Sequence, residues 1–157
     1  MNIKDETIIY PLPDIELLTE KEKKWRLTLP DSYKEFISHY NGGVPIQNSF
    51  IYNSKSYAIT RFLCILKNVK EGKFGWYDIS VIESQIGERL TSNEELVGIE
   101  VLPIAELFAG DYLCLDFRVN KLNPSVCIWD HEESGEFEPI TYWVADSFDN
   151  FMKILTE

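Results

Sequence analysis

The segment CIWDHEESGEFEP, residues 127–139, contains the residue types of this chain that are best suited to chemistry. It holds one histidine and five carboxylates, and it has no lysine or arginine. Such residues could bind a metal ion, act as a general acid/base pair, or form an acidic surface for another molecule. The residues in question are Asp130, His131, Glu132, Glu133, Glu136 and Glu138. The spacing of these residues, their neighbours and the charge of the rest of the chain distinguish these three possible functions.

The spacing argues against a metal centre. A zinc protease of the HExxH type needs a second histidine four residues after the first, whereas position 135 is a glycine. The whole chain has only two histidines, His39 and His131, which leaves too few ligands for a zinc or two-metal site. We therefore expect no metal and no other cofactor.

Asp116, in the run YLCLDF, is the best candidate for an acid catalyst because apolar neighbours favour a protonated carboxyl. The alternative is that Asp116 is a structural strand residue paired with Arg118, which lies two residues later on the same face. No nucleophile elbow and no Cys-His pair accompanies it. We expect no enzymatic activity.

The charge distribution favours the third possibility, an acidic surface. The net charge is -11, and it is concentrated in the second half: residues 76–157 hold 4 Lys and Arg against 17 Asp and Glu. Because nucleic-acid binders need cations to meet phosphates, we expect a basic protein partner and neither nucleic acid nor membrane. Solubility alone is the alternative explanation of an acidic composition.

Ser134-Gly135 predict a turn from which the neighbouring carboxylates project. An ordinary solvated hairpin loop is the alternative interpretation. Tyr112 and Tyr142 could add aromatic anchors beside this turn, whereas Trp129 and Trp143 could equally lie in the core.

Two helices are predicted near the start of the chain. Residues 13–25 have Asp14 as N-cap and an apolar side made of Ile15, Leu18 and Trp25. Residues 29–43, LPDSYKEFISHYNGG, place four apolar residues on one helical face, with His39 off that face. Pro30 suits the first turn, Ser32 and Glu35 could form a capping box, and Gly42 or Gly43 supplies a left-handed C-cap.

The remainder predicts strands, one inserted helix and a closing helix. Strands are expected at 49–53, 56–67, 101–107, 111–117, 125–131 and 141–145, with 111–117 and 125–131 paired antiparallel and a sheet covered on both faces. Helices are expected at 78–90 and after Asp146 or Ser147. The three cysteines, each within an apolar run, are expected to be buried thiols.

Four motifs in this order resemble the SUKH superfamily, named after homology to a yeast regulator of cell-wall synthesis. They are LPxxYxxFxxxxNGG at 29–43, LPIAELFAGDYLCLDFR at 102–118, the strand from Pro124 to Glu132, and VADSFDNFMKIL at 144–155. The first contributes Pro30, Tyr33, Phe36, Asn41, Gly42 and Gly43, which are expected to be structural. The similarity runs from about residue 14 to residue 155.

The resemblance implies an α+β fold without enzymatic activity, with a mixed or mainly antiparallel sheet flanked by N-terminal helices, one inserted helix and a C-terminal helix. Most bacterial members resemble immunity proteins that neutralise toxins, often nucleases, and fungal members are regulatory interaction proteins. Residues 1–157 are thus expected to form one domain of an immunity protein whose acidic surface binds a basic cognate toxin. Asp116 and Tyr112 join the acidic segment in that predicted surface. A regulatory or scaffold module is the alternative. Because the start of the chain has no apolar signal region and no stretch spans a bilayer, we expect a cytoplasmic protein.

Overall fold

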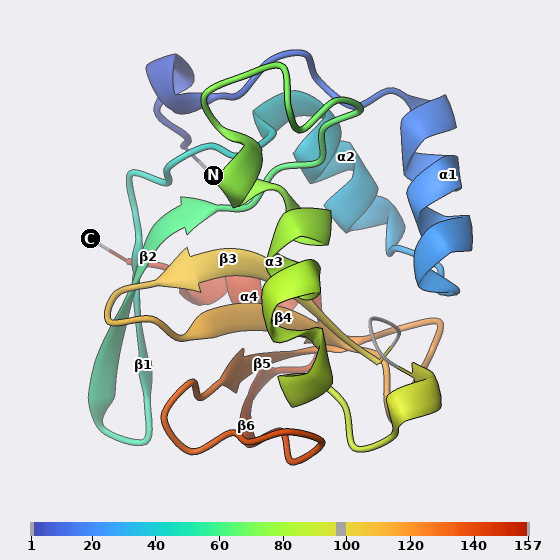
Figure 1. Ribbon diagram of the computed structural model, residues 1–157. Helices are drawn as coiled ribbons and strands as arrows, with labels where there is room; N and C mark the ends of the chain where they lie inside the picture. The colour runs from blue at the N-terminus through green and yellow to red at the C-terminus, as the bar shows by residue number, and fades with distance from the viewer. Residues whose placement is uncertain (1, 97–99, 157) are drawn as a thin grey trace.

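The computed structural model describes residues 2–96 and 100–156, and within them six strands form one antiparallel sheet (Figure 1). The strands lie side by side in the order of the sequence. They are β1 (Ser49–Tyr52), β2 (Lys55–Phe62), β3 (Val101–Leu107), β4 (Tyr112–Asp116), β5 (Ser125–Trp129) and β6 (Thr141–Ala145). The predicted α+β class and the antiparallel pairing of β4 with β5 are confirmed. The strand predicted at 56–67 was too long, because residues 63–67 leave the sheet and Cys64 bridges to Asp78 instead.

Helices cover both faces of the sheet. α1 (Ile15–Trp25) and α2 (Asp31–Tyr40) precede it, α3 (Ile79–Ile86) is inserted between β2 and β3, and α4 (Phe148–Ile154) follows β6. Figure 1 shows α3 in front of the sheet and α4 behind it. In the described part of the chain, no helix is both long and apolar enough to cross a membrane.

The sheet is strongly curled around α4. The ring centroids of Tyr52 on β1 and Tyr142 on β6 are 5.8 Å apart, although these strands are the two ends of the strand order. Five strand spacings in a flat sheet would separate them by roughly 24 Å. Phe151 of α4 packs edge-on against Phe50 of β1 inside the curl. Beyond α4, Thr156 exchanges two backbone hydrogen bonds of 2.8 Å with Ser49 of β1.

The middle strands are buried on both sides, as their continuous hydrophobicity predicted. One cluster, which includes Leu113 and Leu115, packs against α2 and α4. On the opposite face Cys114, Cys127 and Trp129 form a second cluster with Leu90 and Val101. All three cysteines are buried thiols, as expected.

Helix α1 begins where its sequence predicts but faces the core differently. The Asp14 carboxylate accepts the Leu17 N–H at 2.8 Å, which confirms the N-cap. The predicted apolar side was partly wrong, because Ile15 is 82% exposed and Leu17 is buried in its place. At the other end of the chain Ser147, and not Asp146, caps α4 by accepting the Asn150 N–H.

Helix α2 begins two residues earlier than the predicted capping box requires. Pro30 is the N-cap and makes no side-chain cap, so the box of Ser32 and Glu35 was wrong because Ser32 already lies in the first turn. At the C-terminus Gly42 has φ +68°, which confirms one of the two glycines proposed for the left-handed position.

Candidate functional site

The acidic segment forms a loop between β5 and β6, here called the acidic loop (residues 130–138), whose shape is fixed by hydrogen bonds that its backbone groups make. One carboxylate oxygen of Asp130 accepts the N–H groups of Glu132 and Glu133, each at 2.9 Å. The hydroxyl of Ser134, which is buried, accepts the Ile140 N–H at 2.8 Å. Gly135 and Glu138 exchange two backbone hydrogen bonds of 3.0 Å. The predicted turn is therefore present and well ordered.

Arg89 fastens the acidic loop to the rest of the domain. Its guanidinium donates to the carbonyl oxygens of His131 and Ser134 and lies 5.0 Å from the centre of the Trp129 ring. The Trp129 indole N–H in turn donates to the Arg89 carbonyl at 2.9 Å. Sequence reasoning missed Arg89, which lies some 40 residues before the loop in a short 3-10 helix, Gly87–Arg89.

The four glutamates of the acidic loop are all exposed. Glu133 accepts the Tyr142 hydroxyl at 3.0 Å, and Glu132 lies 3.8 Å from the His131 ring. Within the described residues, the carboxylates of Glu136 and Glu138 have no hydrogen bond or salt bridge. These two groups project into solvent with their charge uncompensated.

A hollow of about 540 Å³ adjoins the acidic loop at the end of α3. Three carboxylates line it, from Glu83, Glu88 and Glu136, and Arg89 is also in its wall. Burial raises the pKa of Glu83 to about 8, while the neighbouring Lys24 acts in the opposite direction. The hollow therefore extends the acidic surface beyond the loop through Glu88, whereas Glu83 is mainly protonated at neutral pH and adds little charge.

Asp116 is separate from the acidic loop. It lies at the far end of β4, opposite Ser125, whereas Tyr112 at the near end faces Trp129 beside the loop. Arg118 binds both carboxylate oxygens of Asp116 at 2.9 Å, so the structural interpretation of this residue is correct. The structure thus brings Tyr112 to the acidic loop and leaves Asp116 outside it. Of the two tryptophans considered as anchors, Trp129 is buried and Trp143 is 57% exposed.

Asp111, Asp130 and His131 lie close enough together to hold a cation, their ligand atoms being within 4.8 Å of one another. Each of these groups already has a structural partner. His131 Nδ1 lies 2.6 Å from Asp111 Oδ1, which also accepts the His131 N–H, and Asp130 holds the turn. A structural zinc site needs four ligands, and this cluster offers three among the residues that the structure describes.

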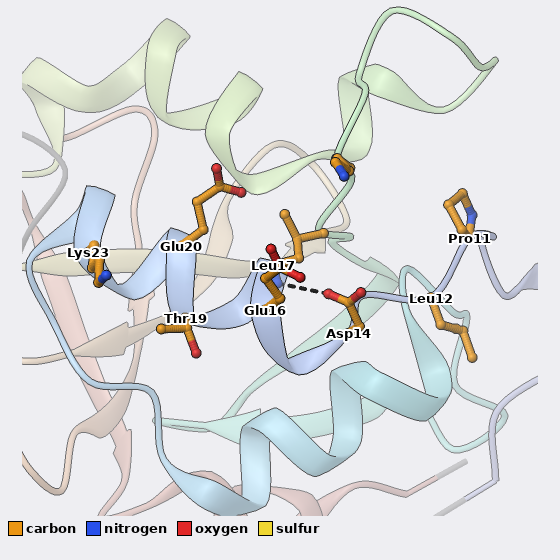
Figure 2. A pocket seen from close by; sticks show the side chains of 9 residues that line it. Pro11, Leu12, Asp14, Glu16, Leu17, Thr19, Glu20 and Lys23 are labelled. Carbon is orange, nitrogen blue, oxygen red and sulfur yellow. Dashed lines mark hydrogen bonds between the residues drawn. The ribbon is translucent and has the colours of Figure 1, made fainter.

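A groove lies elsewhere on the molecule, along α1 (Figure 2). Its larger part has a volume of about 600 Å³. A second pocket of about 270 Å³ adjoins it between residues 9–11 and the segment 66–74. Pro11 and Lys67 line both. None of the predicted site residues lines this groove or the adjoining pocket, so the sequence analysis did not predict a site here.

Comparison with known proteins assigns the chain to a family. The family model SUKH_6, described as SMI1-KNR4 cell-wall, matches residues 15–152. The chain belongs to the SUKH family. SUKH proteins are often toxin-immunity proteins and are generally not enzymes.

One curated relative of this SUKH chain is the SPbeta prophage-derived uncharacterized protein YokK of Bacillus subtilis (strain 168). The two are 24% identical over 149 residues, which is 90% of this chain and 74% of the relative. No solved structure matches the chain significantly. The relative is uncharacterized, so it adds no activity.

The SUKH motif residues of α2 have structural positions. The buried amide of Asn41 donates to the Ile9 carbonyl at 3.0 Å and accepts the Ile65 N–H at 2.8 Å, which joins the N-terminal segment to the chain after β2. Tyr33 and Phe36 are buried and both pack against Phe148 of α4. Pro30 is the N-cap, and Gly42 and Gly43 lie in close contact with the N-terminal segment. These contacts account for the motif without a catalytic role.

Proposed function

We propose that this SUKH protein is a non-enzymatic immunity protein that binds and neutralises a cognate toxin through the acidic loop and the adjoining hollow. The observation that carries the proposal is a set of exposed, uncompensated carboxylates on a loop whose backbone is already fixed. Glu136 and Glu138 are the clearest members of this set. Like charges held this close repel one another, and a basic partner relieves that repulsion.

The rigidity of the loop favours tight binding. Ordering a flexible loop on association costs free energy, and the hydrogen bonds of Asp130, Ser134 and Arg89 have already ordered this one. The hollow lined by Glu83, Glu88 and Glu136 has room for a lysine or arginine side chain of the toxin. Long-range attraction between the acidic face and such a partner would also speed association.

The chemistry of the remaining groups supports a protein that binds and does not catalyse. The carboxylate of Asp116 is held by Arg118, the His131 ring by Asp111, and the cysteines are buried. A nucleophile needs an accessible side chain beside a base, and none of these groups offers that arrangement.

Affinity purification of the tagged protein from its own cells, followed by quantitative mass spectrometry, tests the proposal first. One dedicated partner whose toxicity the protein abolishes is the expected result. Several partners of weaker affinity, none of them toxic, would instead establish a regulatory or scaffold module. An isolated toxin then allows the binding surface to be tested directly.

For that test Glu136→Lys is combined with Glu138→Lys, two substitutions that remove no hydrogen bond of the loop. We expect slower association with the toxin at low salt, a weaker salt dependence, and an unchanged unfolding midpoint. The matched control is Glu6→Lys with Glu35→Lys, which makes the same charge change on exposed residues of other elements. Equal loss of binding in both variants would show that only net charge matters and would refute the assigned surface.

A further inference from the structure

The pocket between residues 9–11 and 66–74 has an apolar floor and an aromatic rim. Ile9 and Leu66 are buried at its base, while Tyr10 is 68% exposed and Phe74 39% exposed at its edge. A volume of about 270 Å³ is below the roughly 300–1,000 Å³ of pockets for drug-sized ligands, so it suits one or two side chains. Trp76, two residues after Phe74 and outside the pocket lining, is also 68% exposed. Exposed aromatic groups around a pocket are typical of a protein contact.

The charge around this pocket is opposite to that of the acidic loop. The segment 61–77 has four cations and one carboxylate, that of Glu71. Lys67, Lys70 and Lys73 are exposed, and in the described part of the chain none of them forms a salt bridge. In Figure 1 this segment, between β2 and α3, lies at the top of the view and the acidic loop, between β5 and β6, at the bottom.

Lys67 occupies the central position, because it lines both the small pocket and the longer groove along α1. The longer part is lined on its α1 side by Asp14, Glu16 and Glu20 (Figure 2). These carboxylates disfavour the regularly spaced phosphates of a nucleic acid or an anionic membrane. One carboxylate beside one apolar side chain suits the site better.

We propose that the small pocket binds an extended segment of a partner protein, with a large apolar side chain in the pocket and one neighbouring carboxylate on Lys67. The exposed rings of Tyr10 and Phe74 border the apolar side chain, and Lys70 and Lys73 on the same segment of the chain add to the attraction for its carboxylate. The recognised carboxylate distinguishes this partner from a basic toxin. The proposal therefore goes beyond the immunity function and does not rest on it.

Selection of a random peptide library displayed on phage against the full-length protein tests the proposal, with the bare support used to remove non-specific clones. The expected result is a consensus with an aspartate or glutamate next to a large apolar residue. A synthetic peptide of that consensus should lose about tenfold in affinity on Lys67→Glu and again on Tyr10→Ala. Lys153→Glu, an exposed lysine of α4, is the matched control and should leave the affinity unchanged.

The absence of a consensus, a consensus without acidic residues, or equal binding by Lys67→Glu protein would each overturn the proposal. Retention of anionic vesicles or of an oligonucleotide by wild type but not by Lys67→Glu would overturn it in favour of a phosphate-binding surface. Urea unfolding midpoints confirm that each variant is folded. The Glu136→Lys and Glu138→Lys variant should bind the peptide normally, so failure of the toxin proposal leaves this experiment unaffected.

Discussion

Replacing Gly42 with alanine should destabilise the protein strongly, for two reasons that the structure separates. The residue has φ +68°, where a side chain costs about 1–2 kcal/mol. A Cβ added there would lie 2.5 Å from Ile9 Cδ1 and 3.1 Å from Cys64 Cβ. Both neighbours are buried, so relief of the clash requires core movement that costs about 1–3 kcal/mol.

The two contributions together predict a loss of about 2–5 kcal/mol, or roughly 4–20 °C in Tm for a domain of this size. Thermal and urea unfolding followed by circular dichroism measure it, and an unchanged urea slope shows that only stability has changed. Gly43→Ala should be intermediate, because its Cβ would meet Ile3 Cγ2 at 2.4 Å without the backbone cost. Gly72→Ala is the control, since nothing lies within 4 Å of an added Cβ. If the Gly42→Ala and Gly72→Ala variants have the same Tm and the same urea midpoint, the assigned backbone conformation of Gly42 is wrong.

Three further predictions concern buried or clustered groups. Burial raises the pKa of Glu83 to about 8 from its ordinary 4.5, so the folded state loses stability as pH rises between these values. Glu83→Gln should remove that loss and raise the urea midpoint at pH 8; a lower midpoint at pH 8 would mean that the carboxylate is ionised and paired. Burial also raises the pKa of the Cys114 thiol well above its ordinary value, so a disulfide reagent should label no cysteine in native protein and all three in guanidinium. Fast native labelling would reveal local opening of the sheet. Protein purified without chelator should contain no stoichiometric zinc, because the cluster of Asp111, Asp130 and His131 offers three ligands among the described residues and a structural zinc site needs four; elemental analysis that finds one zinc per chain would contradict this.

The sequence predicted a helix end correctly where a single capping residue determines that end. Asp14 caps α1, and Gly42 ends α2, because capping depends on a side chain or a backbone conformation within a few residues. Ser32 was misplaced because Pro30, two residues earlier, already lies at the N-cap. The prediction that Ile15 faces the core was wrong for another reason. Helix α1 has apolar residues on more than one side, and the side that packs against the core contains Leu17 and not Ile15.

Only part of the acidic loop could be predicted from the sequence. The exposure of its glutamates could be predicted, because Ser134-Gly135 indicate a turn. Some of the contacts that fix the loop come from Arg89 and Asp111, which are far from it in sequence and reach it only because β4 and β5 pair and α3 packs over the sheet. The pocket between residues 9–11 and 66–74 could not be predicted for the same reason, since its two walls are more than 50 residues apart in the sequence.

A net charge of -11 also hides how the surface is divided. Because salt screens charges within about 10 Å at 0.1 M, a partner responds to the local patch and not to the total. The carboxylates around Glu136 and the lysines around Lys67 lie on separate segments, and substitutions more than about 7–10 Å apart that share no partner usually act additively. The acidic total therefore excludes neither a basic partner at one end nor an acidic partner at the other, and only local substitutions can distinguish them.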